Sequence, residues 1–217
     1  MINRELYMEQ ITPFIDKPFV KVITGIRRCG KSVVLRLISE ELLRRGVSED
    51  YIIYMNFESF EWIDMKEAKA LYAHIQETTK ASGKYYILLD EIQEVTDWEK
   101  AVNAFLVDLD VDIYVTGSNS RLLSSEFSTY LAGRYVAFHI MTLSFKEYLL
   151  FHNLSLTISA SDRKAEFLKY LRMGGFPAIH TANYDYNAIY KIVYDIYSSV
   201  IPVSYTHLRA HETAANL

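Results

Sequence analysis

The sequence predicts a three-layer α/β fold, in which a five-stranded parallel sheet has helices on both faces and is followed by a helical extension. Short runs rich in β-branched and aromatic residues alternate with longer segments whose apolar residues recur at helical spacing. The short runs are apolar at nearly every position, as expected for strands that are buried on both faces. Such strands, separated by helices, are typical of parallel sheets with right-handed crossovers.

The elements follow one another along the chain, and glycines mark several of their ends. Gly25 stops the first strand, and Gly46 is a plausible C-cap of the first long helix. We expect residues 1–150 to form one domain, with residues 1–18 as an N-terminal helix, and residues 151–201 to form a helical extension that starts a C-terminal region. The predicted strands are Phe19–Thr24, Tyr51–Phe57, Tyr85–Leu89, Val111–Thr116 and Tyr135–Ile140. The predicted helices are Lys31–Arg45, Met65–Lys80, Trp98–Leu109, Phe145–Asn153, Asp162–Met173 and Tyr186–Ser199.

The composition is that of an ordinary globular protein. Of its 217 residues 50% are hydrophobic and 23% charged, and 23 basic against 27 acidic residues give a net charge of −4. This charge does not support binding of nucleic acid through bulk positive charge, although a local basic patch is compatible with it. The single cysteine excludes an intrachain disulfide. No apolar run reaches the roughly 18 residues of a membrane helix. The N-terminus has no secretory signal, so we expect a cytoplasmic protein without a membrane partner.

The end of the chain does not read as native polypeptide. Residues 203–213, VSYTHLRAHET, match one reading frame of a common sequencing-library adapter, and residues 216–217 fit the constant stretch that follows its barcode. The alternative is a native polar tail. We therefore leave residues 202–217 out of the fold prediction and expect the natural protein to continue past Ile201.

A loop between the first strand and the first long helix matches the pattern G-x-x-x-x-G-K-[ST]. In GIRRCGKS, residues 25–32, the glycines allow a tight turn whose N–H groups can point at phosphate oxygens. Lys31 offers a positive charge to the β- and γ-phosphates of a nucleotide, Ser32 offers a hydroxyl to Mg²⁺, and the helix N-terminus adds its partial charge. The alternative is an accidental glycine-rich turn. Cys29 is either a small filler or a redox switch that blocks phosphate entry. The candidate nucleotide-binding residues are Gly25, Ile26, Arg27, Arg28, Cys29, Gly30, Lys31, Ser32 and Val33.

Two acidic residues follow the third predicted strand, YYILL. Asp90 at its tip is a candidate magnesium ligand, together with Ser32. Glu91 is a candidate general base that polarises the attacking water. A protein that only binds nucleotide needs the first acid alone, whereas a hydrolase gains from the second. The alternative is a solvated acidic turn after a strand.

The position of the acidic strand predicts the order of the sheet. A strand at residues 51–57 lies in sequence between the phosphate loop and Asp90, which indicates the additional-strand division of P-loop proteins and the strand order 5-1-4-3-2. In that order the tip of the fourth strand faces the γ-phosphate. Ser118 and Asn119 at this tip are candidates to sense the γ-phosphate or to orient water. The alternative interpretation of Ser118 and Asn119 is a turn followed by a helix N-cap.

Arginines near the predicted site are candidates for contacts with phosphate. Arg134 follows LAG just before the fifth strand, and it is a candidate arginine finger that acts on its own nucleotide or on a neighbour's. The alternative is a helix-end arginine paired with local carboxylates. Arg121 is a weaker candidate, and Arg27 and Arg28 belong to the phosphate loop or to a partner contact.

Taken together, these motifs resemble those of the prokaryotic AAA-type ATPases that carry a C-terminal domain of unknown function. The resemblance covers roughly residues 1–200 and rests on GIRRCGKS, YYILLDEIQEV, YVTGSNSRLLSSEF, YLAGRY and LSFKEYL, in this order. The segment MGGFP at residues 173–177 resembles the turn before the family's C-terminal domain. The resemblance implies a P-loop ATPase core that uses Lys31, Ser32, Asp90 and Glu91, with Ser118 as sensor and Arg134 as an additional charge.

The leading functional hypothesis is an ATP-binding protein that hydrolyses ATP with Mg²⁺ and uses the cycle to move a C-terminal module. The alternative is a slow nucleotide-gated switch that acts as a scaffold or a DNA-associated regulator. Glu91 favours hydrolysis, and the absence of a neighbour's arginine favours slow turnover. A small-molecule kinase is disfavoured because the chain has no arginine-rich lid. ATP is the expected ligand, and a homo-oligomer or a protein partner is compatible with the sequence.

Overall fold

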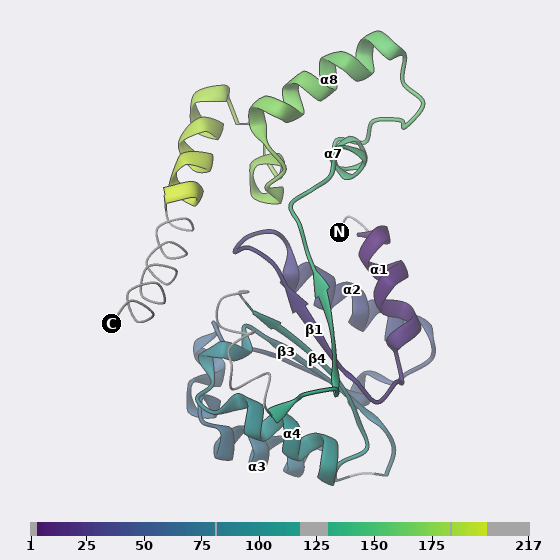
Figure 1. Cartoon of the computed structure of the whole chain (residues 1–217), viewed down its shortest axis with the longest axis vertical. Helices are drawn as coiled ribbons and strands as arrows, with labels where there is room; N and C mark the ends of the chain where they lie inside the picture. The colour runs from purple at the N-terminus through teal and green to yellow at the C-terminus, as the bar shows by residue number, and fades with distance from the viewer. Residues whose placement is uncertain (1–3, 81, 118–129, 183, 199–217) are drawn as a thin grey trace, which may run out of the picture. The chain divides into compact units, whose positions relative to one another are not determined.

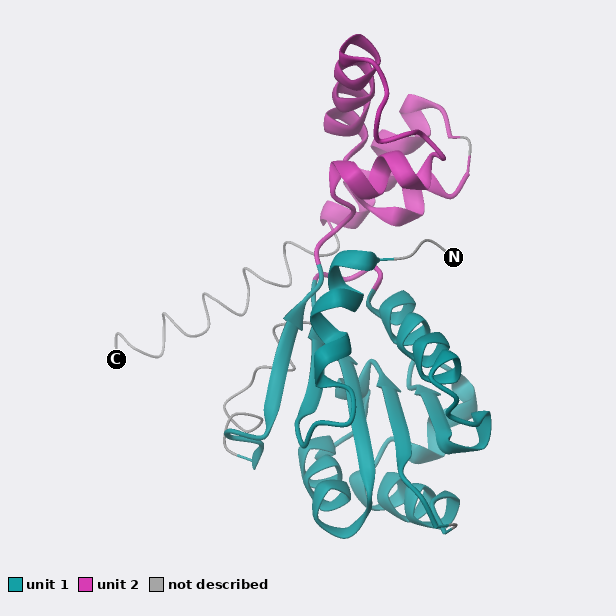
Figure 2. Cartoon of the chain, turned by 90° about the vertical axis from the view of Figure 1, so that its right-hand side faces the viewer, with its two compact units in different colours: residues 1, 3–25, 31–140 teal, residues 2, 26–30, 141–217 magenta. Residues whose placement is uncertain are grey.

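The computed structural model describes residues 4–80, 82–117, 130–182 and 184–198. The chain divides into two compact units, which Figure 2 colours separately. Unit 1 comprises residues 1, 3–25 and 31–140, and unit 2 comprises residues 2, 26–30 and 141–217. In the part of the chain that is described, no helix has both the length and the apolar character that a membrane crossing requires.

Unit 1 is built around a five-stranded sheet in the order β2-β3-β4-β1-β5, with every neighbouring pair parallel (Figure 1). Read from the other edge, this is the predicted order 5-1-4-3-2, so the predicted three-layer fold is confirmed. The three inner strands, β3, β4 and β1, are buried at nearly every position, whereas the edge strands β2 and β5 are partly exposed. The strands are β1 (Val20–Thr24), β2 (Ile52–Asn56), β3 (Tyr85–Asp90), β4 (Val111–Gly117) and β5 (Tyr135–His139).

Helices cover both faces of this sheet (Figure 1). The main hydrophobic core lies between the sheet and the helices α3 and α4, and alternate strand residues such as Val22 and Val115 point into it. On the opposite face the apolar side of α2, with Val34 and Ile38, is fully buried. The helices of unit 1 are α1 (Glu5–Ile11), α2 (Lys31–Arg44), α3 (Ala68–Thr78) and α4 (Trp98–Asp108).

The helices predicted at residues 1–18 and 65–80 are both shorter in the structure, where α1 spans Glu5–Ile11 and α3 spans Ala68–Thr78. Residues Phe60–Met65 form the 3₁₀ helix η3, and the α-helix starts only at Ala68. The intervening Glu67 forms an isolated parallel bridge with Thr96, and Thr96 N donates to Lys66 O at 2.9 Å. These long-range backbone hydrogen bonds hold the segment before α3 in an extended conformation, which local sequence periodicity cannot indicate.

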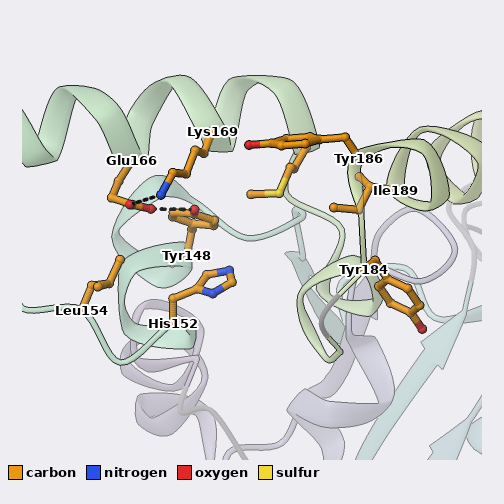
Figure 3. Close-up of a pocket in the computed structure, with 9 residues that line it drawn as sticks. Tyr148, His152, Leu154, Glu166, Lys169, Tyr184, Tyr186 and Ile189 are labelled. Carbon is orange, nitrogen blue, oxygen red and sulfur yellow. Dashed lines mark hydrogen bonds and ion pairs between the residues drawn. The ribbon is translucent and has the colours of Figure 1, made fainter.

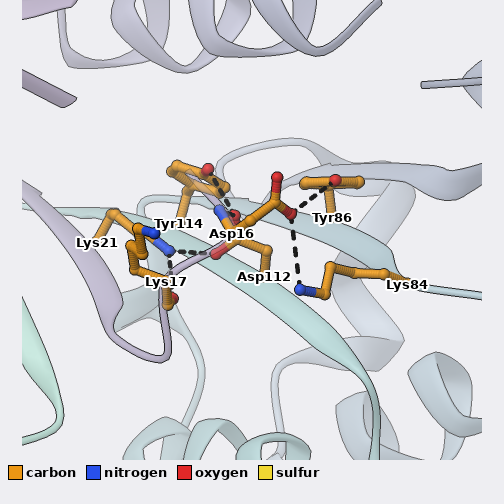
Figure 4. A network of polar contacts seen from close by, with 7 residues as sticks. All are labelled: Asp16, Lys17, Lys21, Lys84, Tyr86, Asp112 and Tyr114. Carbon is orange, nitrogen blue, oxygen red and sulfur yellow. Dashed lines mark hydrogen bonds and ion pairs between the residues drawn. The ribbon is translucent and has the colours of Figure 1, made fainter. Parts of the chain in front are cut away.

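A polar network with buried Lys21 and Asp112 lies near the amino-terminal ends of β1 and β4 (Figure 4). Lys21 forms an ion pair with Asp112 Oδ1 and donates to the carbonyl of Lys17 at 2.9 Å. The second oxygen, Asp112 Oδ2, accepts from Asp16 N and from Tyr114 Oη, both at 2.8 Å. Because both carboxylate oxygens and the ammonium are satisfied, this network fixes the turn before β1 against β4.

Residues 141–198 of unit 2 are mainly helical in their described part. They contain α7 (Phe145–Phe151), α8 (Ala160–Met173), the 3₁₀ helix η5 (Pro177–His180) and a helix at residues 186–198. A capping box starts α7, since Ser144 Oγ accepts from Glu147 N at 3.3 Å and the Glu147 side chain accepts from Ser144 N at 2.8 Å. The described ends of α7, α8 and the helix at residues 186–198 lie within two residues of the ends that the sequence predicts.

A glycine is required where unit 2 folds back on itself. Gly175 O accepts from Leu143 N at 2.7 Å, and a Cβ at residue 175 would lie 2.4 Å from Leu143 O. A larger residue would therefore displace the backbone that leads into α7. This close approach gives a physical reason for Gly175, the second glycine of the MGGFP segment.

A pocket of about 420 Å³ opens among the helices of unit 2 (Figure 3). Its polar groups are paired with one another: Glu166 accepts from Tyr148 Oη at 3.0 Å and from Lys169 Nζ at 2.6 Å. Beside them, His152 Nε2 lies 3.1 Å from His180 Nδ1, and burial lowers the pKa of both histidines. These contacts show that Tyr148, Glu166 and Lys169 take part in the packing of unit 2.

Candidate functional site

The glycine-bounded loop connects the carboxyl end of β1 to the first residue of α2. Three residues in it have positive φ angles, Gly25 at 151°, Arg28 at 68° and Gly30 at 105°. Cys29 is fully buried, and its N–H donates to Ile26 O at 3.3 Å. Such a left-handed backbone in a short loop before a helix is the kind of geometry that directs successive N–H groups toward an anion.

In this loop the side chains of Arg27 and Arg28 are exposed, whereas Cys29 is buried. Burial of the thiol agrees with its interpretation as a small filler. Ser32 and Val33 lie in the first turn of α2, and both are partly buried. The predicted binding residues thus form one continuous stretch, from the end of β1 to the first turn of α2.

Lys31, the first residue of α2, lies beside Glu91, which follows the end of β3. Its ammonium lies 3.2 Å from Glu91 Oε1, and the side chains of Lys31 and Glu91 are only 3% and 14% exposed. The two residues are 60 positions apart in the sequence, and the strand order places their elements together. The structure therefore unites the lysine and the acidic residue that the sequence singled out for chemistry.

Asp90 is fully buried at the end of β3 and is held by two hydroxyl groups. Thr116 Oγ1 donates to Asp90 Oδ1 at 2.5 Å, and Tyr54 Oη donates to Asp90 Oδ2 at 2.9 Å. Burial, followed by the charge of Asp90, raises the pKa of Tyr54 to about 12, against a weaker opposing effect of Arg36. Tyr54 therefore stays protonated at neutral pH and keeps donating to the carboxylate.

Thr116 also contacts the second acidic residue. Its Oγ1 accepts from Glu91 N at 3.0 Å, so one hydroxyl orients Asp90 through its proton and Glu91 through its lone pair. Glu91 has the left-handed backbone angles φ 54° and ψ 48°, which are unfavourable for a residue with a side chain. The hydrogen bond to Thr116 helps to hold this conformation.

Gln93 completes the surroundings of Glu91. Its Nε2 donates to Glu91 Oε2 at 2.6 Å. Sequence reasoning did not single out Gln93, Thr116 or Tyr54 as site residues. The strand order could have indicated Thr116 and Tyr54, because their strands β4 and β2 flank β3 on either side.

Arg134 lies away from this group. It directly precedes β5, whose first residue pairs with Val20 at the start of β1, so it sits at the opposite edge of the sheet, roughly 16 Å away along β1. Its guanidinium donates to Asn103 Oδ1 at 3.1 Å. Parallel strands place their amino and carboxyl ends at opposite edges, so Arg134 does not lie beside Lys31 and Glu91 of its own chain. Its action on its own or on a neighbour's nucleotide stays a prediction. Ser118, Asn119 and Arg121 lie outside the described residues.

The residues present fit a magnesium ion together with a nucleotide. Ser32 and Asp90 offer a hydroxyl and a carboxylate, and oxygen atoms are the ligands that Mg²⁺ prefers. Within the described ranges no group of three or more His, Cys, Asp or Glu residues is placed to hold a metal ion by itself. A magnesium site here would complete its shell with water and phosphate oxygens, as is usual for this ion.

Comparisons with known proteins agree with this geometry. Residues 17–149 match the family described as AAA domain. The chain is 44% identical over 184 residues to an uncharacterized protein of Haemophilus influenzae, an alignment that covers 84% of this chain and 46% of the relative. It is 36% identical over 189 residues to an uncharacterized protein of Methanocaldococcus jannaschii, covering 82% and 39%. The chain thus spans less than half the length of each of these relatives.

Among solved structures, AMPPCP-bound DnaA from Aquifex aeolicus is similar, with a TM-score of 0.51 and 17% sequence identity. The similarity covers 79% of this chain and 57% of that chain, and at this identity it shows the fold alone. The strand order, the glycine-bounded loop before α2 and the family match all point to one conclusion. The chain belongs to the AAA domain family and has the three-layer fold of P-loop nucleoside triphosphatases.

Proposed function

We propose that this protein binds ATP together with Mg²⁺ and hydrolyses it, in the cytoplasm. The observation that carries the proposal is the 3.2 Å pair between Lys31 and Glu91, which joins a G-x-x-x-x-G-K-S loop to two acidic residues at the end of a buried strand. Membership of the AAA domain family supports it, as does the fold shared with DnaA, whose structure contains the ATP analogue AMPPCP.

Each residue of the group has a role in this proposal. Main-chain N–H groups of residues 25–33 bind the phosphates, and Lys31 moves its charge from Glu91 to the β- and γ-phosphates. Ser32 and Asp90 hold Mg²⁺, which neutralises charge on the phosphates. Glu91 accepts one proton from a water whose oxygen attacks the γ-phosphorus. The bond from this phosphorus to the bridging oxygen breaks, its electron pair goes to ADP, and the products are ADP and inorganic phosphate.

The proposal has a second form, in which the chain is a slow nucleotide-gated switch that regulates a partner or a C-terminal module. Two observations favour low turnover of an isolated chain: the base Glu91 is paired with Lys31, and Arg134 is far from the site of its own chain. The relatives are more than twice as long as their aligned parts, so a module that responds to the nucleotide is compatible with them. A DNA partner would show as salt-dependent binding to duplex DNA.

The proposal is tested by titrating the chain with a fluorescent ATP analogue and by measuring phosphate release in the presence of Mg²⁺. We expect Lys31→Met to weaken binding at least 100-fold, because the variant lacks the charge that faces the phosphates. The matched control is Lys80→Met, which removes an exposed lysine paired with Glu77. Equal affinity of wild type and Lys31→Met would exclude this nucleotide site, and binding without phosphate release would favour the switch.

A further inference from the structure

The carboxylate of Glu91 is held from two sides in this structure. Oε1 faces the ammonium of Lys31 at 3.2 Å, and Oε2 accepts from the side-chain amide of Gln93 at 2.6 Å. Lys31 and Gln93 come from separate elements, the start of α2 and the turn after β3. The two oxygens of one acid therefore have different partners.

We propose that Gln93 is a positioning residue that fixes the Glu91 carboxylate and leaves Oε1 as the oxygen that receives the proton from water. This role rests on the proposed ATPase function. Lys31 carries one positive charge and pairs with Glu91 only as long as no phosphate competes for it. When a triphosphate takes the ammonium, Oε1 loses its partner, while the hydrogen bond from Gln93 to Oε2 is unaffected.

The backbone after β3 is shaped to bring these two side chains together. Glu91 has left-handed angles, and the short 3₁₀ helix η4 (Ile92–Glu94) follows it directly. Two turn hydrogen bonds close this segment, Glu94 N to Glu91 O at 3.1 Å and Val95 N to Ile92 O at 2.9 Å. Ile92 and Val95 are buried in the main core and anchor the turn. The contact between residues 91 and 93 is thus a property of a fixed turn.

Gln93 has an additional acceptor that its neighbours do not use. Its Oε1 is buried and has no hydrogen-bond partner among the described residues. A buried amide oxygen without a partner is unfavourable, so it provides a reason to expect a water molecule or a ligand hydroxyl there. Through its two amide atoms, Gln93 can hold the carboxylate and also accept a hydrogen bond from water.

Two substitutions separate these properties of Gln93. Gln93→Met keeps the length of the side chain and removes both polar atoms, whereas Gln93→Glu replaces the donor with a second negative charge beside Glu91. We expect kcat to fall at least 10-fold in Gln93→Met and further in Gln93→Glu, with KM for ATP within twofold of wild type. Gln76→Met, on the exposed side of α3, is the matched control and keeps the wild-type rate.

A second measurement does not depend on turnover. The complex with ADP, Mg²⁺ and aluminium fluoride mimics the transferred phosphoryl group and needs a positioned water, whereas a non-hydrolysable ATP analogue needs only the phosphate contacts. We expect Gln93→Met to weaken the aluminium fluoride complex at least 10-fold and to leave the affinity for the analogue unchanged. In a Glu91→Gln background, adding Gln93→Met should cause no further loss, because the carboxylate it positions is already gone.

The outcomes distinguish this role from the proposed function. If the wild-type chain binds no nucleotide, the proposed function fails and the role of Gln93 fails with it. If the wild-type chain binds nucleotide while Gln93→Met and Gln93→Glu keep its rate and its affinity for the aluminium fluoride complex, only the role of Gln93 is overturned. A variant that loses affinity for the ATP analogue to the same degree would show that Gln93 supports the fold of the site, which also contradicts the proposal.

Discussion

One hydroxyl group, on Thr116, connects the two acidic residues of the candidate site. It donates to the buried side chain of Asp90 and accepts from the backbone of Glu91, which is partly buried. Such a double contact orients a carboxylate without adding charge. It also means that Asp90 and Glu91 respond together to a change at residue 116.

Replacing Thr116 with valine tests this connection. Thr116→Val keeps the shape of the side chain but leaves a buried carboxylate oxygen and a backbone N–H without their partner, which should lower the free energy of unfolding by about 3 kcal/mol. Thr116→Ser retains the hydroxyl and should lose much less. Urea unfolding followed by far-ultraviolet circular dichroism measures both variants, and equal stability of the two would show that the hydroxyl contributes nothing.

At the level of elements, the strands were the most predictable part of the molecule. Strands β1, β3 and β4 are buried on both faces, so most of their residues are apolar and the strands stand out from the amphipathic helices. The order of the sheet could be predicted because the phosphate loop and Asp90 identify β1 and β3. The strand between them in sequence, β2, then lies beyond β3 in the sheet and not between the two. The start of α3 could not be predicted from the sequence, because it depends on the long-range bridge between Glu67 and Thr96.

The candidate site was predictable only where a motif names the residue type. The sequence identifies Lys31, Asp90 and Glu91 because their chemistry and spacing are specific. Thr116 and Gln93 have ordinary local patterns, and their roles depend on which atoms meet after folding. Whether Arg134 acts on the nucleotide of its own chain or on a neighbour's stays a prediction, and its position before β5 places it at the amino end of that strand.

The buried network around Lys21 gives a prediction at this level. Burial lowers the pKa of Lys21, and Asp112 opposes that shift, so each charge depends on the other. Lys21→Met should destabilise the protein by about 3–5 kcal/mol, because it leaves a buried carboxylate without its cation. The double variant Lys21→Met, Asp112→Asn should recover part of that loss. Thermal unfolding measures both, and additive losses would contradict the coupling of this pair.

At the level of the whole molecule, the two edges of the sheet carry different parts of the proposed machinery. Lys31, Asp90 and Glu91 lie at the carboxyl edge, and Arg134 lies at the amino edge. In a head-to-tail assembly whose interface joins the amino edge of one copy to the carboxyl edge of the next, each site would receive an arginine from its neighbour. The exposed position of Arg134 is compatible with this arrangement.

Mixing two inactive variants tests whether copies share a site. Arg134→Ala should lower the rate of phosphate release about 100-fold or more, because an arginine at the transferred phosphoryl group stabilises its charge. Lys31→Met is inactive in its own site but still carries Arg134. In an equal mixture, half of the copies have an intact loop and half of these meet a neighbour with Arg134, so roughly a quarter of the wild-type rate should return. Arg44→Ala, an exposed arginine on α2, is the control and should keep full activity. A mixture that is no more active than the sum of its components would exclude a shared site and leave Arg134 as a residue that holds β5 to α4.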